Sequence, residues 1–235
     1  MSSGVALRLH GPLQAWGGPV VGDDRPTQLF PTRSGVLGLV AACLGIPRAD
    51  NPRLLGLADG ARVHVRVDAP GTPLVDDQTI QDNPNASTTR QTIQSKRTYL
   101  CDASFVAVVI PGPHHTLHEI ASACARPVFA PFLGRRACVP SLPVLLRARV
   151  DGEDALDLFA GLSREPESLV DAAAAVDFYL DLDDHPRKLR RLRVRDAFCG
   201  PLSRQWRERG VVHVRGAVAA TTSEASDPID DWLPQ

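Results

Sequence analysis

The chain has 235 residues, 43% of them hydrophobic, and a formal net charge of -1 at pH 7. This length can bury the core of one domain or of two modest ones. The sequence has no apolar run that could span a bilayer and no charged segment followed by an apolar run at its start, so we expect a soluble cytoplasmic protein. Its five cysteines are widely spaced with no CxxC pair, which argues against a disulfide framework or a structural zinc site.

Charge is unevenly distributed along the chain. Residues 1–150 hold 15 Lys or Arg and 10 Asp or Glu, a balance of +5, whereas residues 151–235 hold 11 and 17, a balance of -6. Within the second half, residues 186–215 carry ten bases and two acids. Such blocks predict one face that attracts a polyanion and another that repels it or docks a basic partner. Solvated surface charge is the alternative interpretation.

The hydrophobic pattern of residues 1–150 predicts the order β-α-β-β-α-β. Period-2 alternation and short apolar runs predict strands, while helical spacing and capping residues predict helices. The expected strands are 5–10, 62–67, 105–110 and 144–150, and the expected helices are 33–44 and 116–125. In the second strand we expect Arg62, His64 and Arg66 to point outward. This order is that of the ferredoxin-like split unit, which also underlies RNA-recognition modules, so the predicted fold class is α+β.

The start of the first predicted helix has the chemistry of an anion site. Thr32 is a candidate N-cap, and Arg33 lies in the first turn, where the helix dipole disfavours a cation. An arginine beside Ser34 and free backbone N–H groups could bind a phosphate. Alternatively, Arg33 is a solvated surface residue.

A long polar connection separates the second and third predicted strands. Two β-prone runs, 74–81 and 90–99, flank a turn-rich segment, which predicts a projecting hairpin within an insertion at about 70–103. The return limb carries Lys96, Arg97 and Tyr99, which would supply bases for phosphates and an aromatic ring for stacking against a nucleic-acid strand. A disordered surface loop is the alternative.

Two further regions of the sequence carry predictions, the segment before the fourth strand and the chain after residue 150. Before the fourth strand, Gly134 permits tight backbone geometry beside a ligand, and Arg135 and Arg136 offer two guanidinium forks for phosphate oxygens. After residue 150 a short helix at 155–162 and strands at 176–182, 189–198 and 210–218 predict a smaller β-rich domain over 151–220. The acidic tail, 221–235, is expected to be disordered or to contact a partner.

Four ordered sequence blocks together resemble the CasD family, the subunit of the subtype I-E CRISPR Cascade complex that holds the 5′ end of the guide RNA. The blocks are RLHGPLQAWG (8–17), DRPTQLFPTRSGVLGLVAACLGI (24–46), YLCDASF (99–105) and FLGRRAC (132–138). The resemblance implies a ferredoxin-like palm, a β-hairpin thumb that kinks the RNA, and a smaller C-terminal β-rich domain. The implied partners are the guide RNA, the backbone subunit and the large PAM-reading subunit, with target DNA met through the complex in antiviral defence.

The resemblance also implies which residues bind RNA. The helix start would bind phosphates of the 5′ handle, and further arginines would complete a basic groove, with a neighbouring loop shaped by Gln14 and Trp16. Handle bases would be splayed out and read at their edges. The implied RNA-binding residues are Gln14, Trp16, Arg25, Thr32, Arg33, Ser34, Lys96, Arg97, Tyr99, Arg135 and Arg136.

Catalysis is the competing function. Related families include metal-independent endoribonucleases that process CRISPR repeat RNA with a Tyr, Lys and His set. Here Lys96 and Tyr99 lie close in sequence and His10 could approach the groove, but no Lys-His pair follows the hairpin. In subtype I-E a separate subunit cuts the precursor RNA, so the resemblance implies a protein that is not an enzyme. His114, His115 and His118 lack accompanying cysteines, and no Walker or GxGxxG loop is present, so neither a metal nor a nucleotide cofactor is expected.

Overall fold

The computed structural model describes residues 1–18, 20, 22–81, 92–164, 175–181, 190–200 and 205–216. The expected turn-rich segment at 82–87 and the start of the return limb, including Arg90, lie outside the described residues, as does the acidic tail at 221–235. In the part that is described, no helix is both long enough and apolar enough to traverse a bilayer.

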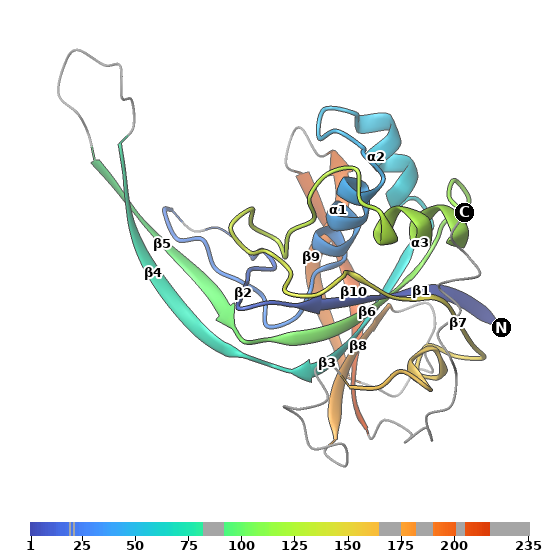
Figure 1. The fold of residues 1–235 in the computed structure, drawn as a ribbon. Coiled ribbons are helices and arrows are strands. Elements are labelled where there is room, and N and C mark those ends of the chain that lie inside the picture. Colours follow the sequence, from blue (N-terminus) through green and yellow to red (C-terminus); the bar gives the residue numbers. More distant parts are fainter. Residues whose placement is uncertain are drawn as a thin grey trace.

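The described strands form two antiparallel sheets. The larger has seven strands in the order β7-β1-β6-β3-β8-β10-β9, and the smaller has the order β2-β5-β4. The larger sheet contains β1 (Ser2–His10), β3 (Arg62–Ala69), β6 (Ser104–Ile110), β7 (Leu145–Gly152), β8 (Val176–Asp181), β9 (Arg190–Gly200) and β10 (Gln205–Gly216). The smaller contains β2 (Leu13–Gln14), β4 (Thr72–Gln81) and β5 (Thr92–Cys101). Figure 1 shows β4 and β5 curving away together from the larger sheet.

Three α-helices lie together on one side of the larger sheet: α1 (Arg33–Cys43), α2 (Asn51–Ala58) and α3 (Leu117–Ala125) (Figure 1). Helices α1 and α3 begin where their capping residues predict. Thr32 accepts a hydrogen bond from the Gly35 backbone, and Thr116 and Glu119 form a reciprocal capping box. Helix α2 was not predicted from the sequence. Part of the short helix expected at 155–162 forms the 3-10 turn η1 (Asp157–Phe159).

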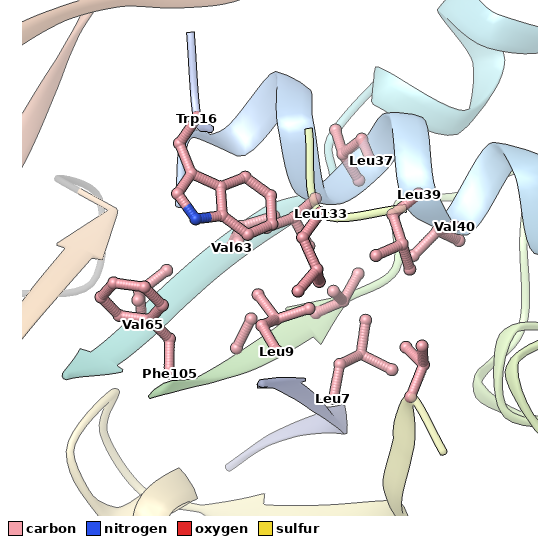
Figure 2. Packing of buried hydrophobic residues seen from close by; sticks show 14 of the residues in the cluster. Leu7, Leu9, Trp16, Leu37, Leu39, Val40, Val63, Val65, Phe105 and Leu133 are labelled. Carbon is pink, nitrogen blue, oxygen red and sulfur yellow. The ribbon is translucent and has the colours of Figure 1, made fainter. Parts of the chain in front are cut away.

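Buried side chains form a core on each face of the larger sheet. The core beneath the helices includes Leu7, Leu9, Val40 and Phe105 (Figure 2). The second core, on the opposite face, packs Val106 and other sheet residues against Phe159 of η1 and its neighbours. Strand β6 lies between the two and is buried at every position, as its apolar sequence predicts.

The second core corrects the expected exposure of one strand. Arg66 and His64 of β3 were expected to point outward, yet both are fully buried. The Arg66 guanidinium donates hydrogen bonds to Asp68 at 2.6 and 2.9 Å and to the carbonyl oxygens of Leu162 and Ser163. The segment that follows η1 therefore covers this face and, together with Asp68, supplies the acceptors that a buried guanidinium requires.

The C-terminal strands also differ from expectation. Three strands form close to the predicted positions, but they do not build a sheet of their own. Strand β8 pairs with β3, from Val65 opposite Tyr179 to Val67 opposite Asp177, and β10 and β9 follow in order. The free edge of β3 explains this outcome, because its unpaired backbone groups are satisfied by accepting another strand.

Candidate nucleic-acid interface

Arg25 and Arg97 are brought together by backbone pairing. Residues 24–26 run alongside β5, where the Arg25 N–H donates to the Lys96 carbonyl at 2.8 Å and the Thr98 N–H donates to the Arg25 carbonyl at 3.1 Å. On the same edge of β5, nearer the larger sheet, β2 pairs with Leu100 and Cys101. The loop after β2 therefore extends the small sheet and carries Arg25 to the edge of the β4-β5 pair.

Arg135 binds both of these segments. Its guanidinium donates to the Arg25 carbonyl at 2.6 Å and to the Thr98 carbonyl at 3.1 Å, and its carbon Cζ lies 4.5 Å from the centre of the Tyr99 ring. Tyr99 itself is only 6% exposed. The ring that was expected to stack on a base thus supports an arginine instead, and it is the planar guanidinium that lies nearer the surface.

The turn that presents Arg135 requires a glycine. Gly134 has φ +91°, and a Cβ atom there would lie 1.6 Å from the Ala15 carbonyl oxygen. The turn is fixed further by hydrogen bonds from Leu133 N to Cys138 O at 2.7 Å and from Ala15 N to Leu133 O at 3.0 Å. The close backbone approach expected at Gly134 is therefore an approach to the chain's own β2 loop.

We call Arg25, Arg97, Arg135 and Arg136 the basic cluster. The last of these follows Arg135 on the turn and is exposed. Lys96 does not share the Arg97 face, because neighbouring residues of a strand point to opposite sides. Lys96 lies opposite Asp77 and Arg97 lies opposite Asp76 in the β4-β5 register. One acid therefore faces the cluster from β4.

Gln14 and Trp16 have structural contacts. The Gln14 side chain is fully buried, and its amide donates to the carbonyl oxygens of Leu9 at 3.1 Å and Ala103 at 2.6 Å while accepting from the Trp16 indole at 2.9 Å. Figure 2 shows the indole beside Leu133. A methyl group added at Gly35 of α1 would lie 2.9 Å from the indole ring. Side chains thus fill the space between helix α1 and the Gly134 turn, where a groove was expected.

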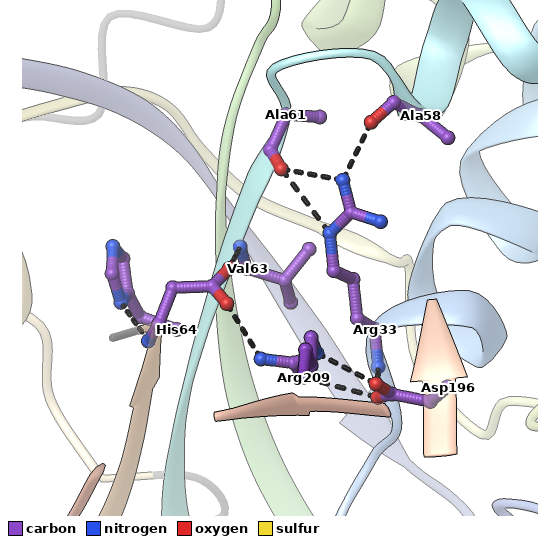
Figure 3. A network of polar contacts seen from close by, with 8 residues as sticks. Arg33, Ala58, Ala61, Val63, His64, Asp196 and Arg209 are labelled. Carbon is purple, nitrogen blue, oxygen red and sulfur yellow. Dashed lines mark hydrogen bonds and ion pairs between the residues drawn. The ribbon is translucent and has the colours of Figure 1, made fainter. Parts of the chain in front are cut away.

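The anion site at the start of α1 is occupied by a carboxylate of the chain. The Arg33 backbone N–H donates to Asp196 Oδ2 at 2.7 Å (Figure 3). Asp196 is 2% exposed and also accepts two hydrogen bonds from Arg209, at 2.6 and 3.0 Å. Burial lowers the pKa of Arg209, but hydrogen bonds and charge interactions with Asp196 and Asp181 outweigh it and raise that pKa. The start of α1 therefore does bind an anionic group, as the helix dipole favours, but that group is the Asp196 carboxylate, 163 residues away in the chain.

The Arg33 side chain points away from that carboxylate. Its guanidinium donates to the backbone carbonyls of Ala58 and Ala61, as Figure 3 shows. Burial lowers the pKa of Arg33, and Asp181 and Asp196 partly oppose this. Arg33 also lines an open pocket of about 850 Å³ together with Arg53, Asp59, His114 and His115. The basic cluster contributes no residue to this pocket.

Sequence reasoning missed Asp196 as the partner of the α1 start. Thr32 caps α1, and Ser34 is half-buried in its first turn. Asp196 is one of only two acids in the basic block 186–215, which is the signal that could have marked it as an ion-pair partner. No group of three or more potential metal ligands occurs among the described residues. His114 pairs instead with Asp59 at 3.1 Å.

Comparison with known proteins shows the family. Residues 4–215 match the family model described as CRISPR-associated protein (Cas_Cas5). The curated Cascade subunit CasD of Escherichia coli (strain K12) is 41% identical over 159 residues, which cover 62% of this chain and 71% of that protein.

Two solved structures are also similar. One, titled "CRISPR RNA-guided surveillance complex", matches at 33% identity and a TM-score of 0.70 over 92% of this chain and 90% of that chain. Another, titled "Crystal structure of Cas protein", matches at 29% identity and a TM-score of 0.64 over 91% and 95% of the two chains. The family match covers most of the sequence, and the resemblance of the four sequence blocks to CasD is confirmed. The chain therefore belongs to the CRISPR-associated Cas5 family.

Proposed function

We propose that the chain is a non-catalytic Cascade subunit that binds the 5′ handle of CRISPR guide RNA and caps that end of the complex. The observation that carries the proposal is the basic cluster, in which three separate segments bring arginines to one edge of β5. Arginine forks suit phosphodiester oxygens, and the guanidinium plane of Arg135 offers a surface on which an unstacked base can lie. The family match and the CasD relative make guide RNA the ligand of choice.

In this proposal residues 1–150 form a ferredoxin-like palm and β4-β5 forms the thumb. The four palm strands follow the order β7-β1-β6-β3, with α1 and α3 on one face, which supports the assignment. The C-terminal strands extend the palm sheet. The remaining partners are the other Cascade subunits, and the complex works in the cytoplasm.

Arg33 and Lys96 lie outside the basic cluster, so we assign them at most auxiliary contacts with RNA. Arg33 lines a pocket to which the basic cluster contributes no residue, and its guanidinium is already bonded to the carbonyls of Ala58 and Ala61. Lys96 is exposed on the other face of β5 and would contact a strand that wraps around the thumb. In this proposal Gln14, Trp16 and Tyr99 support the basic cluster from beneath, whereas Thr32 caps α1.

The endoribonuclease alternative has less support in the geometry. It needs Lys96, Tyr99 and His10 to converge on one phosphate. Lys96 and Tyr99 stand an odd number of residues apart on β5 and so point to opposite faces, and Tyr99 is buried beneath Arg135.

The experiment compares Arg25→Gln combined with Arg136→Gln against a control double variant, Arg48→Gln with Arg126→Gln. All four arginines are exposed, so both variants should fold and carry the same charge. We expect the first variant alone to weaken binding of handle RNA and to reduce its log-log salt slope by about 1.4, at about 0.7 for each lost phosphate contact. Equal slopes for the two variants would count against the basic cluster.

A cleavage assay tests the alternative. Purified protein incubated with repeat RNA in EDTA should give no discrete product. A single specific cut that His10→Ala abolishes would favour the endoribonuclease.

A further inference from the structure

The edge strand of the larger sheet presents a row of arginines. Strand β9 pairs with β10 along one side and ends the described sheet. Val194 and Asp196 face the helices and are 6% and 2% exposed. Arg191, Arg193 and Arg195 point to the opposite face and are all exposed. We call these three the arginine row.

The neighbouring strand does little to neutralise the row. Opposite Arg191 and Arg193 in the β9-β10 register stand the uncharged residues Val212 and Gly210, and Glu208 stands opposite Arg195. Glu208 lies 3.7 Å from Arg193, with side chains 59% and 86% exposed, and an ion pair so open to solvent holds its partners weakly. Within the described β9-β10 pair, the three arginines therefore face one acid from β10, which leaves this strand pair positively charged on that face.

Protection of the sheet edge is the ordinary explanation for charges on an edge strand. That role needs charge, but it does not need one residue type at every outward position. The three successive outward positions 191, 193 and 195 are all arginine, whose planar fork matches phosphate oxygens in a way that lysine cannot. Their spacing is about 6.8 Å, two residues at about 3.4 Å each, which is close to the separation of successive phosphates in an extended strand.

We propose that the arginine row binds the phosphodiester backbone of a second nucleic-acid strand, distinct from the guide RNA held at the basic cluster. The two surfaces belong to different sheets, since the row lies on β9 and the cluster on the edge of β5. A row of guanidinium groups contacts phosphates without reading bases, so it binds RNA and DNA strands of any sequence alike. This inference does not depend on the proposed guide-RNA function.

The test uses the full chain and fluorescence anisotropy with labelled oligonucleotides of about 20 nucleotides that lack the handle sequence. The probes are single-stranded DNA, single-stranded RNA of the same sequence, and duplex DNA, at salt between about 50 and 200 mM. The triple variant Arg191→Gln, Arg193→Gln, Arg195→Gln is compared with the control triple variant Arg48→Gln, Arg126→Gln, Arg149→Gln. All six positions are exposed, and both variants lose three charges.

We expect the row variant to bind both single strands about tenfold or more weakly, with a salt slope reduced by about 2, at about 0.7 for each phosphate contact. The control variant should stay near the parent. Equal losses of affinity in the two variants would mean that the effect comes from net charge alone, which would overturn the proposal. A loss of affinity confined to duplex DNA, or to RNA alone, would overturn a site that binds extended single strands of either sugar type. The preference for handle RNA over RNA of unrelated sequence, measured in parallel, should be retained, because the row does not distinguish sequences. A failure of the row is thereby separated from a failure of the guide-RNA proposal.

Discussion

Replacing Asp196 by alanine removes the carboxylate that joins strand β9 to the start of helix α1. Three hydrogen bonds are lost, from Arg209 Nε, Arg209 Nη2 and the Arg33 backbone N–H. Arg209 keeps only its 2.6 Å contact with Asp181 among these carboxylates. Because Asp196 is 2% exposed, water does not readily replace it.

Removing one partner of a buried ion pair costs about 3–5 kcal/mol, since the remaining charge stays buried without full compensation. A chain of this size loses about 2–4 °C in Tm for each kcal/mol, so the expected fall in Tm is roughly 6–20 °C. The free energy of unfolding is measured by urea titration followed by circular dichroism. Asp196→Asn serves if the alanine variant fails to fold, because it keeps an acceptor for the helix N–H and should lose less.

Glu208→Ala is the control, since it removes an acid from the neighbouring strand β10. Its pair with Arg193 is solvent-exposed, so the expected cost is below about 1 kcal/mol. If Asp196→Ala costs no more than Glu208→Ala, the carboxylate does not anchor α1, and the account of the occupied helix start is wrong.

Three further predictions follow from single positions. Gly134→Ala should lower the free energy of unfolding by at least about 2 kcal/mol, because its Cβ would lie 1.6 Å from a carbonyl oxygen. Gly38→Ala, on the open surface of α1, should raise it by about 1 kcal/mol. Thermal melts in which Gly134→Ala is as stable as Gly38→Ala contradict the turn geometry. Gln14→Leu should lower the free energy of unfolding by more than about 2 kcal/mol, since two carbonyls and an indole N–H lose their partner. If urea unfolding is unchanged and RNA binding is weakened, Gln14 contacts RNA and does not act through these buried hydrogen bonds. Hydrogen bonding from the Thr116 N–H holds the pKa of the Glu119 carboxyl below its ordinary value. The carboxylate therefore stabilises the fold above the pKa of a free Glu, and this stabilisation is lost as pH falls through the lowered pKa. The stability cost of Glu119→Gln should shrink on going from pH 7 to about pH 3, and a pH-independent cost would refute the capping box.

The local elements could be predicted because their signals are local. Thr32 and the Thr116–Glu119 pair cap helices within three residues of themselves, and β6 is recognisable by an unbroken apolar run. Helix α2 escaped prediction, although Asp50 accepts a hydrogen bond from Arg53 N as an N-cap and Pro52 stands in its first turn. Its eight residues carry too short an apolar pattern to distinguish it from a loop.

Part of the candidate site was within reach of sequence reasoning. Alternation along β5 separates Lys96 from Arg97, so their division between two faces needed no tertiary information. The pairing of Arg25 with Arg97 and the packing of Arg135 on Tyr99 could not be predicted, because they join segments 72 and 36 residues apart. The hydrogen bonds that hold these segments together are made to backbone carbonyls, which every residue possesses.

The sequence by itself determined where helices α1 and α3 begin, which strands are apolar, and, through four blocks, the family. Only the tertiary structure decided which charged groups are free to meet a ligand. Arg33 and Arg66 look like surface cations in their local patterns, yet distant segments cover both and supply carbonyl acceptors, to which Asp68 of the same strand adds a carboxylate for Arg66. The reason is physical: burying a charge is tolerable only when partners are present, and here the carbonyl partners come from elements far away in the chain.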